Sequence, residues 1–360
     1  MSNPFRTVLV GCGSISRAWL QATNTLPQVE YVGLVDLNLA QAEALKSKFP
    51  SLANAAIGID LETMLKQTSP DIVFDCTVPE AHTAVTLTAL KHGCHVLGEK
   101  PLADTVANAS KMLQAAEASG KTYAVIQNRR YLDDIVRFRS LIQSGDIGKL
   151  TTLNADFYLG PHFGGFRDEM AHVLLLDMAI HSFDQARFIS GADPIAVYCH
   201  EWNPAGSWYA HGASAIAIFE MSNGLIFTYR GSWCAEGLNT TWECDWRAVG
   251  TSGTAVWDGG ANMQAERPIS NEGFLREQTA VLPPDIIPLT HTAHAGVIAE
   301  FLDSITNGTT SQTICTDNIK SLIMVYAAIH SAQTKQRVVI ADFVADDPYL
   351  ANLFSGSSAL

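Results

Sequence analysis

Near its start the chain reads Val8-Leu9-Val10-Gly11-Cys12-Gly13-Ser14-Ile15-Ser16, a short apolar run followed by a glycine-rich segment. Three consecutive apolar residues predict a buried strand, two glycines predict a tight turn, and a helical pattern starts at Ser16. The first glycine permits the turn, and the second allows a close approach to the backbone. The third position of this pattern needs a small residue, and serine is small. The stretch is therefore typical of the first strand-turn-helix unit of a doubly wound α/β domain.

The same alternation of strands and helices continues to about residue 126. Predicted strands lie at residues 7–10, 29–35, 72–76, 95–97 and 122–126, and predicted helices at 16–24, 39–48, 61–66, 81–92 and 106–119. Strands linked through helices form a parallel sheet with helices on both faces, because each connection crosses over the sheet. We expect residues 1–126 to form a Rossmann domain with such a doubly wound parallel sheet.

After residue 126 the pattern changes to β-prone runs, several of which alternate polar and apolar positions. The runs lie at residues 150–158, 195–201, 213–220, 225–232, 241–250 and 254–257. Asn223-Gly224, between two of them, is a strong hairpin signal. Helices are predicted at 171–190, 294–306 and 316–335, a closing strand at 338–340, and an irregular surface excursion with four prolines at 266–290. We expect residues 127–360 to form an α+β domain with an open, mostly antiparallel sheet and helices on one face.

The composition disfavours several classes of protein. The 360 residues carry a formal net charge of −13 and have a pI near 5.2, which disfavours binding to nucleic acid or to an anionic membrane. No apolar stretch reaches the length of a membrane span and residues 1–6 do not resemble a secretory signal, so we expect a cytoplasmic location. The seven scattered cysteines lack paired spacing, so neither a disulfide framework nor a zinc site is expected.

Asp36 adds the second part of a dinucleotide-binding pattern. It directly follows the predicted strand at 29–35, about twenty residues beyond Ser16, where a carboxylate can bind a ribose hydroxyl. The diphosphate would then lie at the positive end of the helix that starts at Ser16. Leu37, Asn38 and Leu39 follow, with no arginine or lysine to bind a 2'-phosphate, so NAD is favoured over NADP.

A lysine follows another predicted strand of the same sheet. The run at 95–97 leads into Gly98-Glu99-Lys100-Pro101, and open α/β sheets bind ligands at the carboxyl ends of their strands. Four further motifs are Thr77-Val78-Pro79-Glu80-Ala81-His82, Gln127-Asn128-Arg129-Arg130-Tyr131, Gly145-Asp146-Ile147-Gly148 and Asp177-Met178-Ala179-Ile180-His181. In this order the motifs resemble the glucose-fructose oxidoreductase/inositol dehydrogenase/MocA (Gfo/Idh/MocA) family over nearly the whole chain.

The resemblance implies a two-domain NAD(P)-dependent oxidoreductase of sugars, polyols or related cyclic substrates. Lys100, Asp177 and His181 match the family's catalytic lysine, aspartate and histidine, and Asn128 and Arg129 match positions that line the substrate pocket. We expect the cofactor to contact Gly11, Gly13, Ser14, Ile15, Asp36, Thr77, Pro79, His82, Glu99 and Lys100. The segments at 160–167 and 172–176 depart from the commonest family pattern, which leaves the identity of the substrate open.

The chemistry of the residues supports these roles. Asp177 and His181 are four apart in a predicted helix, so both side chains share one face. A histidine titrates near neutral pH and can take a hydroxyl proton, while the carboxylate orients it or binds an adjacent hydroxyl. Lys100 can stabilise the charge on the same oxygen while a hydride passes to nicotinamide. An Asp-His pair with this spacing is also a common helix surface contact, so the catalytic interpretation depends on Lys100 and the glycine turn.

Other side chains are candidates for the surroundings of the site. His162 and Arg167 are included among the substrate-binding residues, because both can bind hydroxyls. Further candidates for the pocket wall, which could equally fill a core, are Trp202, Trp208, Tyr209 and His211. His291 and His294 share a helix face, but no third ligand has suitable spacing, so we expect no metal.

Tryptophans on the predicted sheet indicate a face that needs a cover. They are Trp233, Trp242, Trp246 and Trp257. A second copy of the chain could provide the cover, so we expect a homo-oligomer, either a dimer or a tetramer.

Two other functions remain open at this point. An NAD-dependent glycosidase would oxidise its substrate transiently, eliminate the leaving group and then reverse the oxidation. A non-catalytic sensor would bind NAD and a sugar without turnover. The joint presence of Lys100, Asp177 and His181 disfavours the sensor, because a binding protein needs no proton-transfer group.

Overall fold

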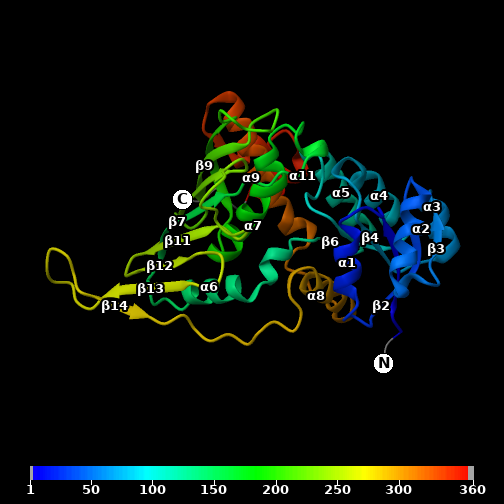
Figure 1. Cartoon of the computed structure of the whole chain (residues 1–360), viewed down its shortest axis with the longest axis horizontal. Coiled ribbons are helices and arrows are strands. Elements are labelled where there is room, and N and C mark those ends of the chain that lie inside the picture. The colour runs from blue at the N-terminus through cyan, green and yellow to red at the C-terminus, as the bar shows by residue number, and fades with distance from the viewer. Residues whose placement is uncertain (1–2, 356–360) are drawn as a thin grey trace. The chain divides into compact units, whose positions relative to one another are not determined.

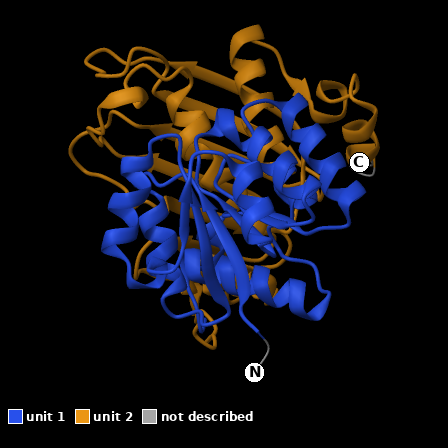
Figure 2. Cartoon of the chain, turned by 90° about the vertical axis from the view of Figure 1, so that its right-hand side faces the viewer, with its two compact units in different colours: residues 1–131, 289–319 blue, residues 132–288, 320–360 orange. Residues whose placement is uncertain are grey.

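The computed structural model describes residues 3–355 and divides into two compact units (Figures 1 and 2). Unit 1 comprises residues 1–131 and 289–319, and unit 2 comprises residues 132–288 and 320–360. Each unit contains one sheet with its own helices. The chain therefore combines an α/β unit with an α+β unit, as the sequence predicts.

The sheet of unit 1 has six parallel strands in the order β3-β2-β1-β4-β5-β6. The strands are β1 (Phe5–Val10), β2 (Val29–Val35), β3 (Ala56–Gly58), β4 (Ile72–Asp75), β5 (His95–Gly98) and β6 (Tyr123–Val125). This is the Rossmann strand order, in which the direction of winding reverses between β1 and β4. The prediction of a doubly wound parallel sheet is confirmed, although the short strand β3 was not predicted.

The helices of unit 1 begin and end close to their predicted limits. They are α1 (Ser16–Thr23), α2 (Leu39–Lys48), α3 (Leu61–Thr68), α4 (Pro79–Lys91), α5 (Val106–Ser119) and α8 (Ala293–Asn307), with short 3-10 turns at Pro50–Leu52 and Asn128–Tyr131. Side-chain caps fix several starts: Asn38 accepts from the Ala40 amide, and Asp60 accepts from the Thr63 amide. Such caps satisfy amides that have no partner inside the helix.

Unit 1 is discontinuous in the sequence, which differs from the two consecutive domains that we expected. Helix α8 packs against α1, and its residues Val297 and Phe301 are fully buried in the same core as Leu9 and Trp19. Residues 289–319 belong to the first unit because this apolar helix face is buried in its core, although they come after most strands of the second sheet in the sequence. The sequence pattern identifies the helix but not the sheet on which it packs.

The sheet of unit 2 has nine strands in the order β14-β13-β12-β11-β7-β10-β9-β8-β15. They are β7 (Leu150–Tyr158), β8 (Pro194–Trp202), β9 (Ser214–Met221), β10 (Ile226–Ser232), β11 (Asp245–Gly250), β12 (Thr254–Trp257), β13 (Met263–Pro268), β14 (Gln278–Val281) and β15 (Val338–Val339). Among the described pairs of this second sheet, only β7 and β10 are parallel, and the others are antiparallel. The expected mostly antiparallel sheet is confirmed.

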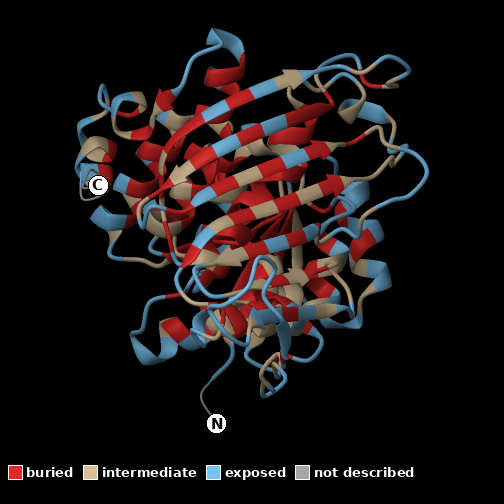
Figure 3. Cartoon of the chain, turned by 90° about the vertical axis from the view of Figure 1, so that its left-hand side faces the viewer, coloured by how far each residue is buried: buried red, intermediate tan, exposed pale blue. Residues whose placement is uncertain are grey.

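Helices cover one face of this sheet and leave the other open. They are α6 (Asp133–Gln143), α7 (Ile180–Ser190), α10 (Ile340–Phe343), α11 (Pro348–Phe354) and the part of α9 (Cys315–Thr334) beyond residue 319. Phe183 of α7 packs edge-on against Phe219 and Tyr229 of the sheet. Along β7, β9, β10 and β11, which Figure 3 shows from the open side, buried residues mostly alternate with more exposed ones. This alternation is typical of an antiparallel sheet with one covered face.

Three segments of unit 2 differ from the prediction. The excursion expected at 266–290 contains a hairpin of β13 and β14, whose mostly exposed residues give no apolar alternation. Helix α6 was missed, although its apolar residues have helical spacing. The helix expected at 171–190 begins at Leu174, and its first part, Leu174–Ala179, is a π-helical turn.

The described residues show two further properties. Residues 3–355 contain no helix that is long and apolar enough to cross a membrane, and no cluster of three or more residues that could hold a metal ion. All seven cysteines are free, and all but Cys234 are buried.

Candidate active site

The glycine turn follows β1 at the point where the winding of the sheet reverses. Gly11 has a φ of +86°, and a Cβ at this position would lie 2.6 Å from the backbone oxygen of Cys76. Its amide donates to the carbonyl of Val35, at 2.8 Å. Only glycine combines this left-handed φ with such a close contact between two loops. Gly11 therefore determines the shape of the turn.

The outer side of the turn is open. A Cβ at Gly13 would meet no atom within 4 Å, and Gly13, Ser14 and Ile15 are all exposed. The buried hydroxyl of Ser16 donates to the carbonyl of Gly13, at 2.6 Å, which closes the turn from inside. Exposed amides at the start of α1, beside open space, fit a diphosphate group.

Asp36 lies at the end of β2 and is partly exposed. Its Oδ2 accepts from the backbone N–H of Cys12, at 2.7 Å, and its Oδ1 accepts from that of Asn38, at 2.8 Å. A carboxylate has about four acceptor positions, so both oxygens can still bind ribose hydroxyls. The next residue, Leu37, is 93% exposed and offers no charge to a 2'-phosphate. The geometry fits NAD.

The segment after β4 contains a buried histidine-carboxylate pair. Nδ1 of His82 lies 2.9 Å from Oδ2 of Asp75, and the two side chains are 1% and 0% exposed. The hydroxyl of Thr77 donates to the other oxygen of Asp75, at 2.6 Å. Burial alone would lower the pKa of His82, but the contact with Asp75 outweighs it and raises that pKa. His82, which the sequence placed among the cofactor contacts, is therefore buried and supports the loop of Thr77 and the partly exposed Pro79.

Lys100 and Glu99 follow β5, the neighbour of β4. Lys100 is partly exposed and precedes Pro101 through a cis peptide bond. Glu99 is only 6% exposed, and its carboxylate accepts from the Trp19 indole at 2.7 Å. Burial raises the pKa of Glu99, although the Trp19 hydrogen bond and Lys100 act in the opposite direction. Glu99 is thus buried, and its contact with the cofactor stays a prediction.

Asn128 and Arg129 lie in the 3-10 turn that follows β6, and both are partly exposed. The side chain of Asn128 lies 3.4 Å from Nδ1 of His294 in α8. Burial lowers the pKa of His294, which favours a neutral imidazole beside the amide. The next arginine, Arg130, is buried and bound to Asp317 at 3.0 Å, so it has a structural role.

In unit 2, Asp177 lies within the π-helical turn and His181 lies in the first turn of α7. The side chain of Asp177 is 14% exposed, and His181 is 9% exposed. π-Helical turns occur frequently at functional sites, and no local sequence signal predicted this one. His172, two residues before the turn, has a φ of +56° and is bound to Glu201 of β8 at 2.5 Å.

Asp177 forms an ion pair with Arg167 from the preceding loop. Nε of Arg167 donates to Oδ2 of Asp177 at 2.6 Å. The guanidinium group also lies over the rings of Phe163 and Phe166, 4.9 and 4.7 Å from their centroids. Both phenylalanines are exposed, at 49% and 67%. The sequence indicated Arg167 and Asp177 separately, and the structure brings them together.

The loop at 160–170 is tied to the loop at 201–212. The ring of His162 stacks on Trp208, with centroids 3.8 Å apart, and its Nε2 lies 3.1 Å from Glu236. The amide of Ala210 donates to the carbonyl of Asp168, at 2.7 Å. Aromatic and polar groups thus gather beside the Arg167-Asp177 pair, in an arrangement suited to a sugar ring.

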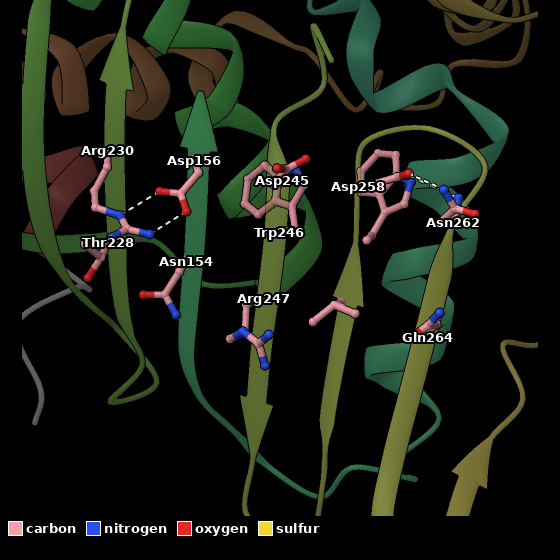
Figure 4. A pocket seen from close by; sticks show the side chains of 12 residues that line it. Asn154, Asp156, Thr228, Arg230, Asp245, Trp246, Arg247, Asp258, Asn262 and Gln264 are labelled. Carbon is pink, nitrogen blue, oxygen red and sulfur yellow. Dashed lines mark hydrogen bonds and ion pairs between the residues drawn. The ribbon is translucent and has the colours of Figure 1, made fainter. Parts of the chain in front are cut away.

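A recess of about 590 Å³ on the open face of the sheet was not predicted (Figure 4). Arg230 binds Asp156 through two hydrogen bonds, and Asn262 donates to Asp258 at 2.6 Å. Burial, together with Asp156 and Asp258, raises the pKa of Asp245. Of the residues that line this recess, Trp246 and Trp257 were named from the sequence as part of a sheet face, and none was named as a site residue.

The candidates thus form two sets, one in each unit. Unit 1 places the glycine turn, Thr77 and Lys100 after the adjacent strands β1, β4 and β5. Unit 2 places Arg167, Asp177 and His181 in one loop and the helix that follows it. The first set can hold a dinucleotide, and the second can bind hydroxyls and transfer a proton.

Both units match models of known families. Residues 5–127 match the model described as "Oxidoreductase family, NAD-binding Rossmann fold", and residues 135–256 match the "GFO/IDH/MocA C-terminal domain". D-glucoside 3-dehydrogenase of Escherichia coli (strain K12) is 31% identical over 247 residues, which cover 62% of this chain and 69% of the relative. 1,5-Anhydro-D-fructose reductase of Ensifer adhaerens is 25% identical over 340 residues, which cover 92% and 97%.

Solved structures share the fold. An oxidoreductase from Agrobacterium radiobacter, in complex with NAD+, L-tartaric acid and magnesium, has a TM-score of 0.83 at 19% identity. The match covers 95% of this chain and 100% of that chain.

Proposed function

Because the chain belongs to the Gfo/Idh/MocA family of NAD-binding oxidoreductases, we propose that it transfers a hydride between NAD and a ring secondary alcohol or ketone. The substrate is a sugar, a glycoside or an inositol-like compound. The observation that carries the proposal is the position of Lys100 after β5, in the same sheet as the glycine turn and Asp36. That edge of an open α/β sheet is where ligands bind.

The chain's own residues account for cofactor binding. The open turn at Gly13, Ser14 and Ile15 receives the diphosphate, and Asp36 binds the ribose hydroxyls. Thr77, in the loop after β4, provides a further contact to the cofactor. When bound, NAD accepts or returns the hydride of the reacting carbon.

We assign proton transfer to His181. It removes the proton of the substrate hydroxyl, and Lys100 donates a hydrogen bond to the same oxygen as negative charge develops there. Asp177, whose charge is balanced by Arg167, binds an adjacent hydroxyl or orients His181. Reduction of a ketone uses the same residues in reverse, with His181 returning the proton.

The substrate class has support from the relatives and from the loop chemistry. One relative is named as a dehydrogenase of D-glucosides and another as a reductase of an anhydro sugar. The exposed rings of Phe163 and Phe166 and the stacked Trp208 suit contacts with sugar faces. Asn128, Arg129, His162 and Arg167 supply polar groups for hydroxyls.

The open face of the sheet supports a homo-oligomer, with a second copy of the chain as its cover. Tyr198 lies opposite Ile218 across β8 and β9, and both are more than 40% exposed. The same face carries both signs of charge, including Asp156 with Arg230, so it can pair with itself around a two-fold axis. Ile218→Glu should reduce the mass of the particle in light scattering, and an unchanged mass would exclude this face.

Absorbance of reduced nicotinamide tests the reaction with a panel of monosaccharides, glycosides, inositols and their keto forms. Net formation or loss of reduced cofactor supports the proposal. Release of a sugar without net reduction would instead indicate the glycosidase, and binding without turnover would indicate the sensor. Lys100→Ala and His181→Ala should lower kcat by orders of magnitude and leave NAD binding intact. Lys48→Ala and His330→Ala, at exposed positions, are the matched controls.

A further inference from the structure

Glu99 connects the peptide of Lys100 to helix α1. Its Oε1 accepts a hydrogen bond from Nε1 of Trp19, at 2.7 Å. Its Oε2 accepts one from the backbone N–H of Lys100, at 3.1 Å. The two oxygens of one buried carboxylate therefore bind two groups that are far apart in the sequence.

Trp19 is fixed relative to the glycine turn. It lies one turn into α1, is 0% exposed, and packs its ring 5.1 Å from that of Phe74 in β4. The same helix starts at Ser16, whose hydroxyl closes the turn on Gly13. Trp19 is therefore packed in the helix that follows the cofactor-binding turn, and its indole also binds Glu99.

Packing alone does not explain a glutamate at this position. Burial of an ionised carboxylate is costly because its hydration is lost, so an apolar side chain would fill the space more favourably. The carboxylate gains two hydrogen bonds to N–H donors, which are stronger when the acceptor is charged. His82, buried and bound to Asp75, is a further titratable neighbour that interacts with Glu99.

We propose that Glu99 is a positioning residue for Lys100. Through Trp19, it keeps the Lys100 peptide in a fixed relation to α1 and the glycine turn, so that the lysine and the bound cofactor stay aligned. The inference rests on the role that the proposed function gives to Lys100. It assigns Glu99 no contact with the substrate.

Glu99→Gln tests this link. In glutamine an NH2 group replaces one carboxylate oxygen, so either Trp19 or Lys100 would face a donor in place of its acceptor. We expect kcat to fall roughly 10- to 100-fold, as small misplacements of catalytic groups do, while the Kd of NAD changes less than about twofold. Glu117→Gln, at an exposed position of the same unit, should retain full activity. Trp19→Phe removes the donor from the other end and should give the same loss, which keeps the test valid if one variant folds poorly.

A double-mutant cycle separates positioning from general damage. In the Lys100→Ala background, Glu99→Gln should cause no further fall in kcat, because Glu99 acts through Lys100. A further fall, or normal kcat in a folded Glu99→Gln variant, would overturn the inference. If Lys100→Ala itself turned over normally, the proposed function would fail instead.

Discussion

Gly11 and Gly13 stand two residues apart in one turn, yet the structure predicts opposite consequences for the same substitution. Gly11 has a φ of +86° and faces the loop after β4, whereas Gly13 has an ordinary φ and faces open space. Gly11→Ala should therefore lower the stability of unit 1. Gly13→Ala should leave stability unchanged and weaken the binding of NAD.

The expected loss of stability in Gly11→Ala has two parts. An alanine in the left-handed region costs roughly 1–3 kcal/mol. Its Cβ would lie 2.6 Å from the Cys76 oxygen and 2.8 Å from the Thr77 nitrogen, so the loops must separate by about 0.8 Å to reach an ordinary 3.4 Å contact. Overpacking of this kind costs about 1–3 kcal/mol. We expect the free energy of unfolding of unit 1 to fall by about 2–6 kcal/mol.

Urea denaturation, followed by circular dichroism, measures the first effect, and titration of NAD measures the second. For Gly13→Ala we expect a stability change within about 0.5 kcal/mol, and a Kd for NAD raised at least about tenfold by the added methyl group. If Gly11→Ala unfolded at the wild-type urea concentration, the close packing of the two loops would be wrong. If Gly13→Ala bound NAD normally, the turn would not be the diphosphate site.

Three further predictions concern single side chains. Asp36→Ala should raise the Kd of NAD roughly tenfold, measured by titration, because the ribose hydroxyls lose their acceptor. Arg167→Gln should lower kcat/KM about 10- to 100-fold with NAD binding unchanged, because Asp177 loses the cation that holds it at 2.6 Å. His82→Gln should lower the free energy of unfolding by about 3 kcal/mol at pH 6, because Asp75 keeps a buried charge without its partner. The raised pKa of His82 sets the sign of the pH dependence: the stabilisation is complete below the ordinary value of 6.5 and decreases as the pH rises through the folded pKa.

Each of these predictions has a control or a contrary result. Asp60→Ala, at an exposed helix cap, should not change the affinity for NAD. If Arg167→Gln and the wild type had equal kcat/KM, the assignment of Arg167 to the active site would be wrong. For His82→Gln, a stability loss that grew between pH 6 and pH 8 would contradict the direction of the pKa shift.

Much of the fold follows from local patterns in the sequence. Strand β2 and helices α2 and α5 have the limits that the sequence predicts, because apolar positions with period 2 or 3.6 end at polar caps and glycines. Strands β13 and β14 were missed because most of their side chains are exposed, so pairing with a neighbour determines them. The π-helical turn has no sequence signal that we can name.

The candidate site was predictable as a set of residue types but not as a set of contacts. Spacing and chemistry suggested Lys100, Asp177, Arg167 and Glu99 individually. The hydrogen bond between Trp19 and Glu99 joins positions eighty residues apart, and the pair of Arg167 with Asp177 depends on the path of an irregular loop. Local sequence patterns cannot predict such contacts, because the contacts depend on how separate elements pack.

The discontinuity of unit 1 bears on how the protein is made. As the chain leaves the ribosome, residues 1–131 emerge long before α8, whose Val297 and Phe301 complete the core around Leu9 and Trp19. Until then the nascent Rossmann sheet presents an uncovered apolar flank to water. Synthesis of the whole second sheet therefore separates the start of the first core from its completion, and a fragment that ends at residue 131 would keep that flank exposed permanently.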